Sequence, residues 1–67
     1  MSTWILSQSD EYRSRGQELC RRNSVTEAKA AADGFARGYP LQEHWVVDGD
    51  GWWVAGPEGG CWRVDPL

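Results

Sequence analysis

Two carboxylates, Asp48 and Asp50, alternate with glycines in the segment Asp48-Gly49-Asp50-Gly51, which is the spacing found at the start of calcium-binding loops. A calcium loop also needs oxygen ligands at further alternate positions and a closing glutamate, but here Trp52 and Trp53 follow the second glycine. We therefore interpret the segment as a tight turn, and we expect no metal to bind there.

The one histidine and the two cysteines are the other residues with chemical potential. They are His44, Cys20 and Cys61, which are too few and too widely spaced for a zinc motif. A cysteine nucleophile would need His44 as its base, but the strand pattern described below separates His44 from Cys61 by roughly 9–10 Å. We therefore expect no metal, no cofactor and no enzymatic activity, and we expect both cysteines to be thiols in a reducing compartment.

Acidic side chains are concentrated in the second half of the chain. Residues 1–37 carry six basic and five acidic side chains, whereas residues 38–67 carry one basic and five acidic ones, within a net charge of −3. Alternate residues of a strand lie about 6.5–7 Å apart, which is close to the spacing of adjacent phosphates, so these carboxylates could meet a basic surface. The alternative is that they serve solubility alone. The five are Glu43, Asp48, Asp50, Glu58 and Asp65.

The same half of the chain has the pattern of three short antiparallel strands. The runs 44–47, 52–55 and 61–65 are rich in tryptophan and valine, and glycine-containing turns separate them. Because side chains alternate along a strand, these turns assign each residue to one of two sheet faces. The predicted core face carries Trp45, Val47, Trp52, Val54, Trp62 and Val64. The other face carries His44, Val46, Trp53, Ala55, Cys61 and Arg63.

Trp53 is the one tryptophan that the predicted core does not need. Its expected neighbours are Val46, His44 and Arg63. Tryptophan and arginine are enriched at the hot spots of protein interfaces, so Trp53 could anchor a partner. The alternative is that the amino-terminal segment covers this face and makes it a second small core.

The segment from Ser24 to Gly38 predicts the main helix. Ser24 and Glu27 have the spacing of a capping box, and Gly38 with the following Tyr39-Pro40 ends the pattern. The apolar stripe of this helix is mostly alanine, which lets its axis lie close to a sheet with bulky side chains. The stripe consists of Val25, Ala28, Ala32, Phe35 and Ala36.

The first 22 residues give weaker patterns. Trp4-Ile5-Leu6 predicts either a fourth strand or a tail packed on the core. Residues 9–22 begin with acidic and end with basic side chains, which suits the macrodipole of a second helix; an irregular loop is the alternative. The predicted fold is therefore α+β, with an antiparallel sheet of three or four strands and one main helix on its tryptophan-rich face.

Length and hydropathy limit the organisation and location of the protein. Sixty-seven residues predict one domain, residues 1–67, in which a few large tryptophans supply much of the core. The three-residue apolar stretch near the amino terminus predicts neither a signal peptide nor a membrane span. We expect a cytoplasmic protein whose negative charge does not favour direct binding of nucleic acid.

In its small size, acidic second half and helix-on-sheet layout, carried by Ser24–Gly38 and His44–Asp65, the chain resembles the anti-CRISPR proteins of phages and mobile elements. The resemblance implies stoichiometric binding to a CRISPR effector complex in the host cytoplasm. Such a protein would occupy the basic channel that receives DNA, or would block a contact between subunits.

Three functional hypotheses follow from these patterns, and the third is a ligand-binding or catalytic domain. The first is a non-enzymatic inhibitor of anti-CRISPR type, a monomer that binds a basic surface through the five carboxylates Glu43, Asp48, Asp50, Glu58 and Asp65, with Trp53 as an anchor. The second is a structural or assembly module that forms a homodimer through a sheet edge or through the face that carries Trp53.

Overall fold

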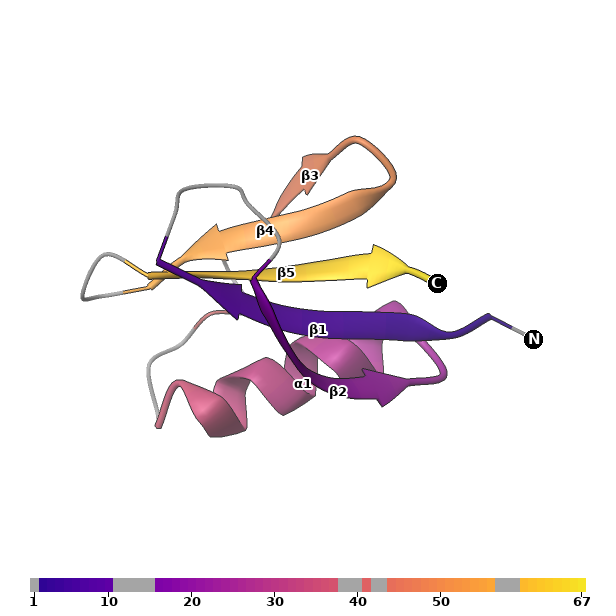
Figure 1. Cartoon of the computed structure of the whole chain (residues 1–67), viewed down its shortest axis with the longest axis horizontal. Coiled ribbons are helices and arrows are strands. Elements are labelled where there is room, and N and C mark those ends of the chain that lie inside the picture. Colours follow the sequence, from indigo (N-terminus) through magenta and orange to yellow (C-terminus); the bar gives the residue numbers. More distant parts are fainter. Residues whose placement is uncertain (1, 11–15, 38–40, 42–43, 57–59) are drawn as a thin grey trace.

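A computed structural model describes residues 2–10, 16–37, 41, 44–56 and 60–67 of the chain. These residues form five strands and one helix (Figure 1). The elements in chain order are β1 (Trp4–Ser9), β2 (Gln17–Arg22), α1 (Val25–Phe35), β3 (Val46–Asp48), β4 (Gly51–Ala55) and β5 (Cys61–Pro66). Within the described residues, no helix is long and apolar enough to cross a membrane.

The strands form one antiparallel sheet in the order β2-β1-β5-β4-β3, and α1 packs against one face of it (Figure 1). This arrangement confirms the predicted α+β class with an antiparallel sheet. The number of strands is five rather than three or four, because both β1 and β2 join the three strands of the second half. Strand β5 is central, and β2 and β3 are the two edges.

The predicted second helix is wrong for the described part of residues 9–22, where Gln17–Arg22 forms strand β2. Leu6 of β1 faces Cys20, and a bulge after Leu6 shifts the register so that Ser7 faces Glu18. The bulge leaves consecutive residues Leu19 and Cys20 both half-buried against the core, a pattern that resembles one face of a helix in sequence. Pairing with β1 thus overrides the local helical pattern.

The predicted register of the last three strands is confirmed. Val47 pairs with Trp52, and Trp52 and Val54 of β4 pair with Val64 and Trp62 of β5. These pairs place the three valines and the two tryptophans on the face that meets α1. Val54, Trp62 and Val64 are buried in the core, and Trp45 and Trp52 pack partly buried against it.

Val47 lies on the predicted face but is not part of the core, because it is 58% exposed. It belongs to the short edge strand β3, whereas the backbone of α1 approaches β1, β2 and β5. Leu6 of β1, with no exposed surface, and Leu41, which follows the helix in the chain, complete the core instead.

Helix α1 begins as predicted, because the Ser24 side chain accepts a hydrogen bond from the backbone N–H of Glu27 at 3.1 Å. Ala28 and Ala32 are fully buried against the sheet, which confirms the close alanine-lined contact. The helix ends earlier than predicted, at Phe35, and Arg37 adopts a left-handed conformation with φ 55°. Gly38, the predicted end, lies outside the described residues.

Candidate functional site

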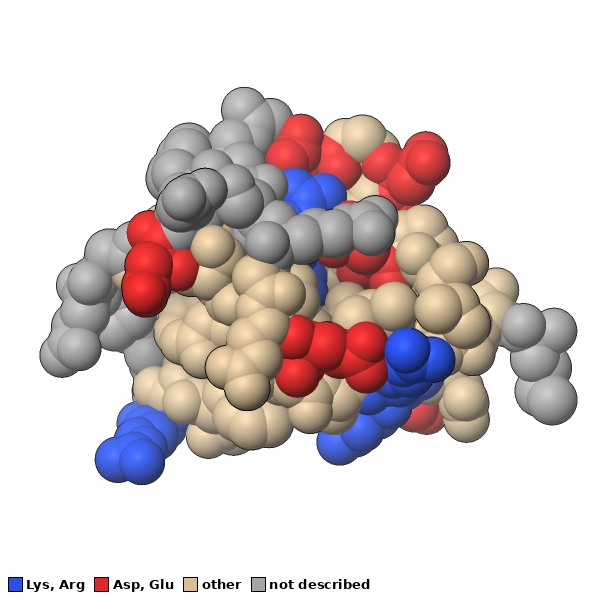
Figure 2. Space-filling model, viewed as in Figure 1, with Lys and Arg blue, Asp and Glu red and all other residues tan. Residues whose placement is uncertain are grey.

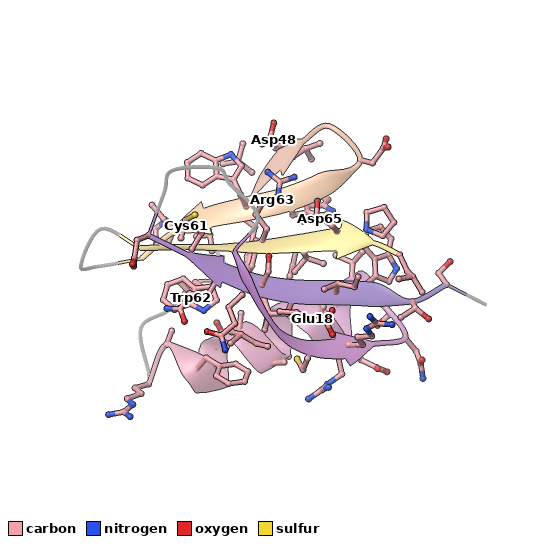
Figure 3. The ribbon with its side chains drawn as sticks, in the orientation of Figure 1. Glu18, Asp48, Cys61, Trp62, Arg63 and Asp65 are labelled. Atoms are coloured by element: carbon pink, nitrogen blue, oxygen red, sulfur yellow. The ribbon has the colours of Figure 1, made fainter. Side chains whose placement is uncertain are left out.

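Three of the predicted site residues meet on the second face of the sheet, which is the face opposite α1. Asp48 of β3 and Asp65 of β5 bind Arg63, also from β5 (Figure 3). Trp53 of β4 pairs with Arg63 across β4 and β5. We call Asp48, Arg63 and Asp65 the Arg63 cluster. It forms because alternate residues of β5 face the same side, so Arg63 and Asp65 project together away from the helix.

The Arg63 guanidinium binds both aspartates. Its Nη1 donates to Asp48 Oδ2 at 2.7 Å, and its Nη2 donates to Asp65 Oδ1 at 2.9 Å. The Arg63 Nε donates to Asp65 Oδ2 at 3.1 Å, which makes the contact with Asp65 bidentate. A further bond at 3.3 Å runs from Nη2 to the backbone carbonyl of Asp48, so Arg63 also binds the main chain of the edge strand.

A glycine in the intervening strand makes room for this arrangement. Gly51 of β4 pairs with Asp48, and a Cβ at Gly51 would overlap Asp65 Oδ1 and the carbonyl oxygen of Val64. The missing side chain therefore lets the carboxylate of Asp65 lie over β4 while Arg63 reaches across β4 to β3. The side chains of the cluster therefore link β3 to β5 across β4.

Burial means that the charges of the cluster must be paired with one another. Arg63 and Asp65 are 8% and 4% exposed, and moving charges out of water is unfavourable unless they are paired. Hydrogen bonding to Asp65 is the largest of the effects that raise the pKa of Arg63 above its ordinary value, and Asp48 adds to it. The guanidinium is therefore charged at every accessible pH, and it offsets the charge of its two neighbours.

A small pocket of about 160 Å3 adjoins the cluster on the same face. One of its walls is Ser7, which pairs with Arg63 across β1 and β5 and is 5% exposed. Within the described part of the chain, the Ser7 Oγ has no hydrogen-bond partner. Another wall is Glu18 of β2, an exposed residue that forms an ion pair with Arg21 at 2.9 Å.

The predicted site residues therefore divide into three groups. Asp48 and Asp65 are bound to Arg63, and Trp53, which is 9% exposed, pairs with Arg63 across β4 and β5. Asp50 is exposed in the turn between β3 and β4. Glu43 and Glu58 lie outside the described residues.

Sequence reasoning placed Arg63 beside Trp53 but did not predict that it binds two aspartates. A signal was present, because Arg63 is the one basic residue of the acidic second half and shares a strand face with Asp65. Ser7 and Glu18 were not predicted either. Their positions depend on β2 and on the bulge opposite it, which the sequence did not indicate.

The edge of the sheet formed by β3 exposes two consecutive apolar side chains. Val46 and Val47 are 51% and 58% exposed, and Asp50 is exposed at the following turn. We call Val46, Val47 and Asp50 the β3 edge surface. Figure 2 shows acidic side chains at several separate places on the face in view, with basic side chains among them, so negative charge does not form one continuous patch there.

The described residues contain no group of three or more His, Cys, Asp or Glu side chains that could hold a metal ion. Cys20 and Cys61 are thiols and not a disulfide, as the sequence predicted. Cys61 is buried on β5, and His44 is exposed near the start of β3.

Comparison with protein families, curated proteins and solved structures gave no match to the chain.

Proposed function

We propose that the protein is a non-enzymatic binding protein that docks on a positively charged surface of another protein through the β3 edge surface. The observation that carries this proposal is the exposure of Val46 and Val47, both above one half, on an edge strand. An edge strand presents backbone N–H and C=O groups that an extended segment of a partner can pair with. Exposed valines on such a strand add apolar contact area.

The charge of this half of the chain selects a basic partner. Residues 38–67 carry five acidic side chains and one basic one, and that basic residue, Arg63, is enclosed between Asp48 and Asp65. Asp50 at the end of the β3 edge surface is exposed. An approaching cationic surface would be attracted by the field of these carboxylates, and the attraction would weaken as salt is added.

The Arg63 cluster supports docking by holding the edge strand in place. Strand β3 has three residues, and Arg63 binds both the side chain and the backbone carbonyl of Asp48 within it. A strand fixed in this way loses less conformational freedom when a partner pairs with it. In this proposal Asp48 and Asp65 act through Arg63 and do not touch the partner directly.

In its most specific form, the proposal makes the partner a CRISPR effector complex in the cytoplasm of a host cell, with the protein acting as a monomeric inhibitor. Its support is the resemblance of size, charge and layout to anti-CRISPR proteins. The positively charged channel of such an effector is the kind of surface that the acidic half would meet. Inhibition would follow from blocking the approach of target DNA.

The test is to titrate the purified protein into purified effector complexes of several CRISPR types and to measure capture of fluorescent target DNA. We expect one type to lose DNA binding in proportion to added protein. Asp50→Lys and Val47→Lys should each weaken this inhibition at least about tenfold, since each removes a contact of the β3 edge surface.

Glu27→Lys is the control matched to Asp50→Lys, because it makes the same change in net charge at an exposed position on α1. It should inhibit like the unchanged protein. If all three variants inhibit equally well, the β3 edge surface is not the docking site. If no effector type is affected, the CRISPR form of the proposal fails, and titration with a basic peptide then tests whether the β3 edge surface binds a cationic partner.

Self-association is the second candidate function, and the same exposed edge favours it. Two copies could pair their β3 strands and extend the sheet across both chains. Light scattering after size exclusion, over about a hundredfold range of concentration, separates the candidates. A dimer that Val47→Lys converts to a monomer would support self-association, whereas a monomer at every concentration would exclude it.

A further inference from the structure

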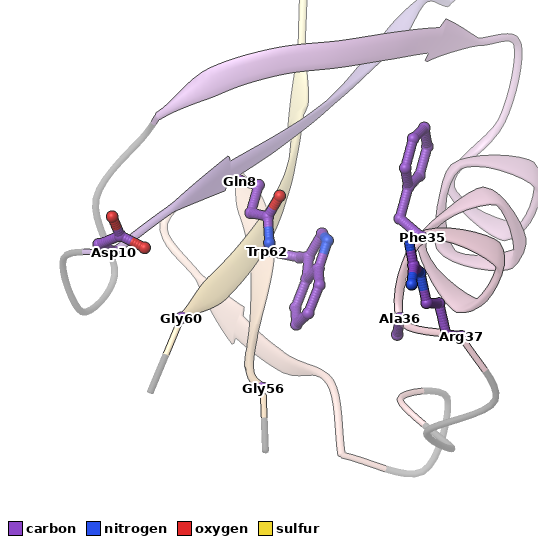
Figure 4. A pocket seen from close by; sticks show the side chains of 8 residues that line it. All are labelled: Gln8, Asp10, Phe35, Ala36, Arg37, Gly56, Gly60 and Trp62. Carbon is purple, nitrogen blue, oxygen red and sulfur yellow. The ribbon is translucent and has the colours of Figure 1, made fainter. Parts of the chain in front are cut away.

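A second and larger pocket lies at the other end of the sheet, between the end of α1 and the ends of the strands (Figure 4). Its volume is about 500 Å3, within the range of small-molecule sites. It is separate from the β3 edge surface, none of whose residues lines it. The lining residues are Gln8, Asp10, Phe35, Ala36, Arg37, Gly56, Gly60 and Trp62.

Two aromatic side chains form facing sides of this pocket. In Figure 4 Trp62 stands on the strand side and Phe35 on the helix side. Phe35 is 48% exposed, although it lies on the apolar stripe of α1, so the core does not use its ring fully. Gly56 lies against the Trp62 ring so closely that a Cβ there would overlap the ring, so the absence of a side chain at this position leaves room for the indole.

Trp62 also brings an unused hydrogen-bond donor to the pocket. The residue is 6% exposed, and among the described residues its Nε1–H has no acceptor. In Figure 4 the edge of the ring that carries the nitrogen is turned toward the side of the pocket where Phe35 lies. A buried donor without an acceptor is unfavourable, and an acceptor atom placed in the pocket would relieve this.

Arg37 is a positively charged residue whose backbone adopts an unfavourable conformation. Its φ of 55° makes it the one described residue other than glycine with a positive φ. The position follows a helix end, where glycine or asparagine is the usual residue, so an arginine here is conformationally costly. Arg37 lines the pocket as an exposed residue at the end of α1, and strained residues are found more often at functional sites than elsewhere.

We infer that this pocket binds a small planar aromatic molecule that carries an anionic group. The ring would lie between Trp62 and Phe35, and an acceptor atom of the ligand would receive the Trp62 Nε1–H. The carboxylate or phosphate of the ligand would bind the Arg37 guanidinium. Gln8 and Asp10 on the strand side supply an amide and a carboxylate for donor groups of the ligand.

Two kinds of molecule share this chemistry, an aromatic carboxylate and a mononucleotide. We choose indole-3-acetate and guanosine 5′-monophosphate as the probes for the two, and inorganic phosphate as an anion without a ring. The readout is the Trp62 indole N–H signal in 15N-labelled full-length protein, because that group lies in the pocket and its signal is resolved from backbone amides.

We expect a saturable shift of the Trp62 indole signal with at least one aromatic probe and none with inorganic phosphate at the same concentration. Saturation by indole-3-acetate alone would identify an aromatic acid as the ligand class, and saturation by the nucleotide alone would identify a nucleotide. No saturable shift with either probe up to about 10 mM, tenfold above a Kd of about 1 mM, would overturn the inference.

Variants at Arg37 test the role of its charge while the fold is kept. Arg37→Asn suits the left-handed backbone and removes the guanidinium, so it should weaken binding about tenfold, as expected for loss of one charge-assisted hydrogen bond. Arg37→Lys keeps a positive charge and should weaken binding less. Equal affinities for the original protein and Arg37→Asn, with the backbone spectrum unchanged, would contradict the assignment of the anion to Arg37.

Discussion

Arg63 and Asp48 lie on strands that are not neighbours, yet Arg63 Nη1 is 2.7 Å from Asp48 Oδ2. The guanidinium reaches across β4, where Gly51 has no side chain to separate Asp48 from Asp65. This contact fixes the edge strand β3 to the central strand β5. It also explains why two of the carboxylates expected to face a partner are instead occupied within the protein.

Arg63→Met should destabilise the protein severely. It leaves Asp65, which is 4% exposed, without its bidentate partner, and removing one member of a buried ion pair typically lowers the free energy of unfolding by about 3–5 kcal/mol. Urea unfolding followed by tryptophan fluorescence measures this loss. A loss below about 1 kcal/mol would show that Asp65 is solvated or differently paired.

A triple variant separates the charge of the cluster from its packing. Arg63→Met combined with Asp48→Asn and Asp65→Asn removes all three charges, so no charged group is left buried without a partner. It should recover more than half of the stability lost in Arg63→Met, because no uncompensated buried charge remains. Equal instability of the two variants would instead assign the loss to packing of the Arg63 side chain.

Gly51→Ala should be destabilising although it adds one methyl group. The added Cβ would overlap Asp65 Oδ1 and the backbone carbonyl of Val64, and a backbone atom cannot move aside easily. We expect a loss of about 1–3 kcal/mol in the free energy of unfolding. Gly34→Ala is the control: nothing lies within 4 Å of its Cβ, and alanine in a helix should raise stability by about 0.5–1 kcal/mol.

The ion pair of Glu18 and Arg21 predicts that the stability of the fold depends on pH in the acidic range. The hydrogen bond from Arg21 lowers the pKa of Glu18 below its ordinary value of 4.5. Since the pKa is lower in the folded state, the pair stabilises the fold above the unfolded pKa, and this contribution is lost as pH falls through the folded value. NMR titration of the Glu18 side chain should show the low pKa, and Arg21→Gln should return it toward 4.5.

The contact of Lys29 with two tryptophans is tested by substitution of the lysine. Its ammonium lies 3.4 Å from the ring centre of Trp52 and 5.8 Å from that of Trp45, while burial lowers its pKa. Lys29→Met keeps most of the packing but loses the cation–π attraction, so we expect the free energy of unfolding to fall by about 0.5–1 kcal/mol at most. The fall is partly offset because a charged group is no longer partly buried. Lys29→Arg should stay close to the original protein in a thermal melt.

The second half of the fold was predictable because alternation and turn residues act locally. The turns between 44–47, 52–55 and 61–65 determined which residues face each other, and the pairs Trp52 with Val64 and Val54 with Trp62 were found as predicted. The start of the helix was predictable for the same reason, since the cap of Ser24 on Glu27 spans three residues.

Features that depend on distant contacts were not predictable. Strand β2 has a local pattern that fits a helix, and its pairing with β1, including the bulge, decides otherwise. The Arg63 cluster needs β3, β4 and β5 in their final order, and a glycine at the crossing point. The 500 Å3 pocket joins residues from β1, α1 and β5, which no local pattern connects.

The central claim, docking of a basic partner on the β3 edge surface, is tested most directly by NMR with a defined probe. We would titrate an extended peptide of alternating lysine and valine into 15N-labelled protein and map the shifted amides. The account predicts saturable shifts concentrated on Val46, Val47 and Asp50, which weaken as salt is raised. Shifts concentrated on α1, or none at millimolar peptide, would contradict it.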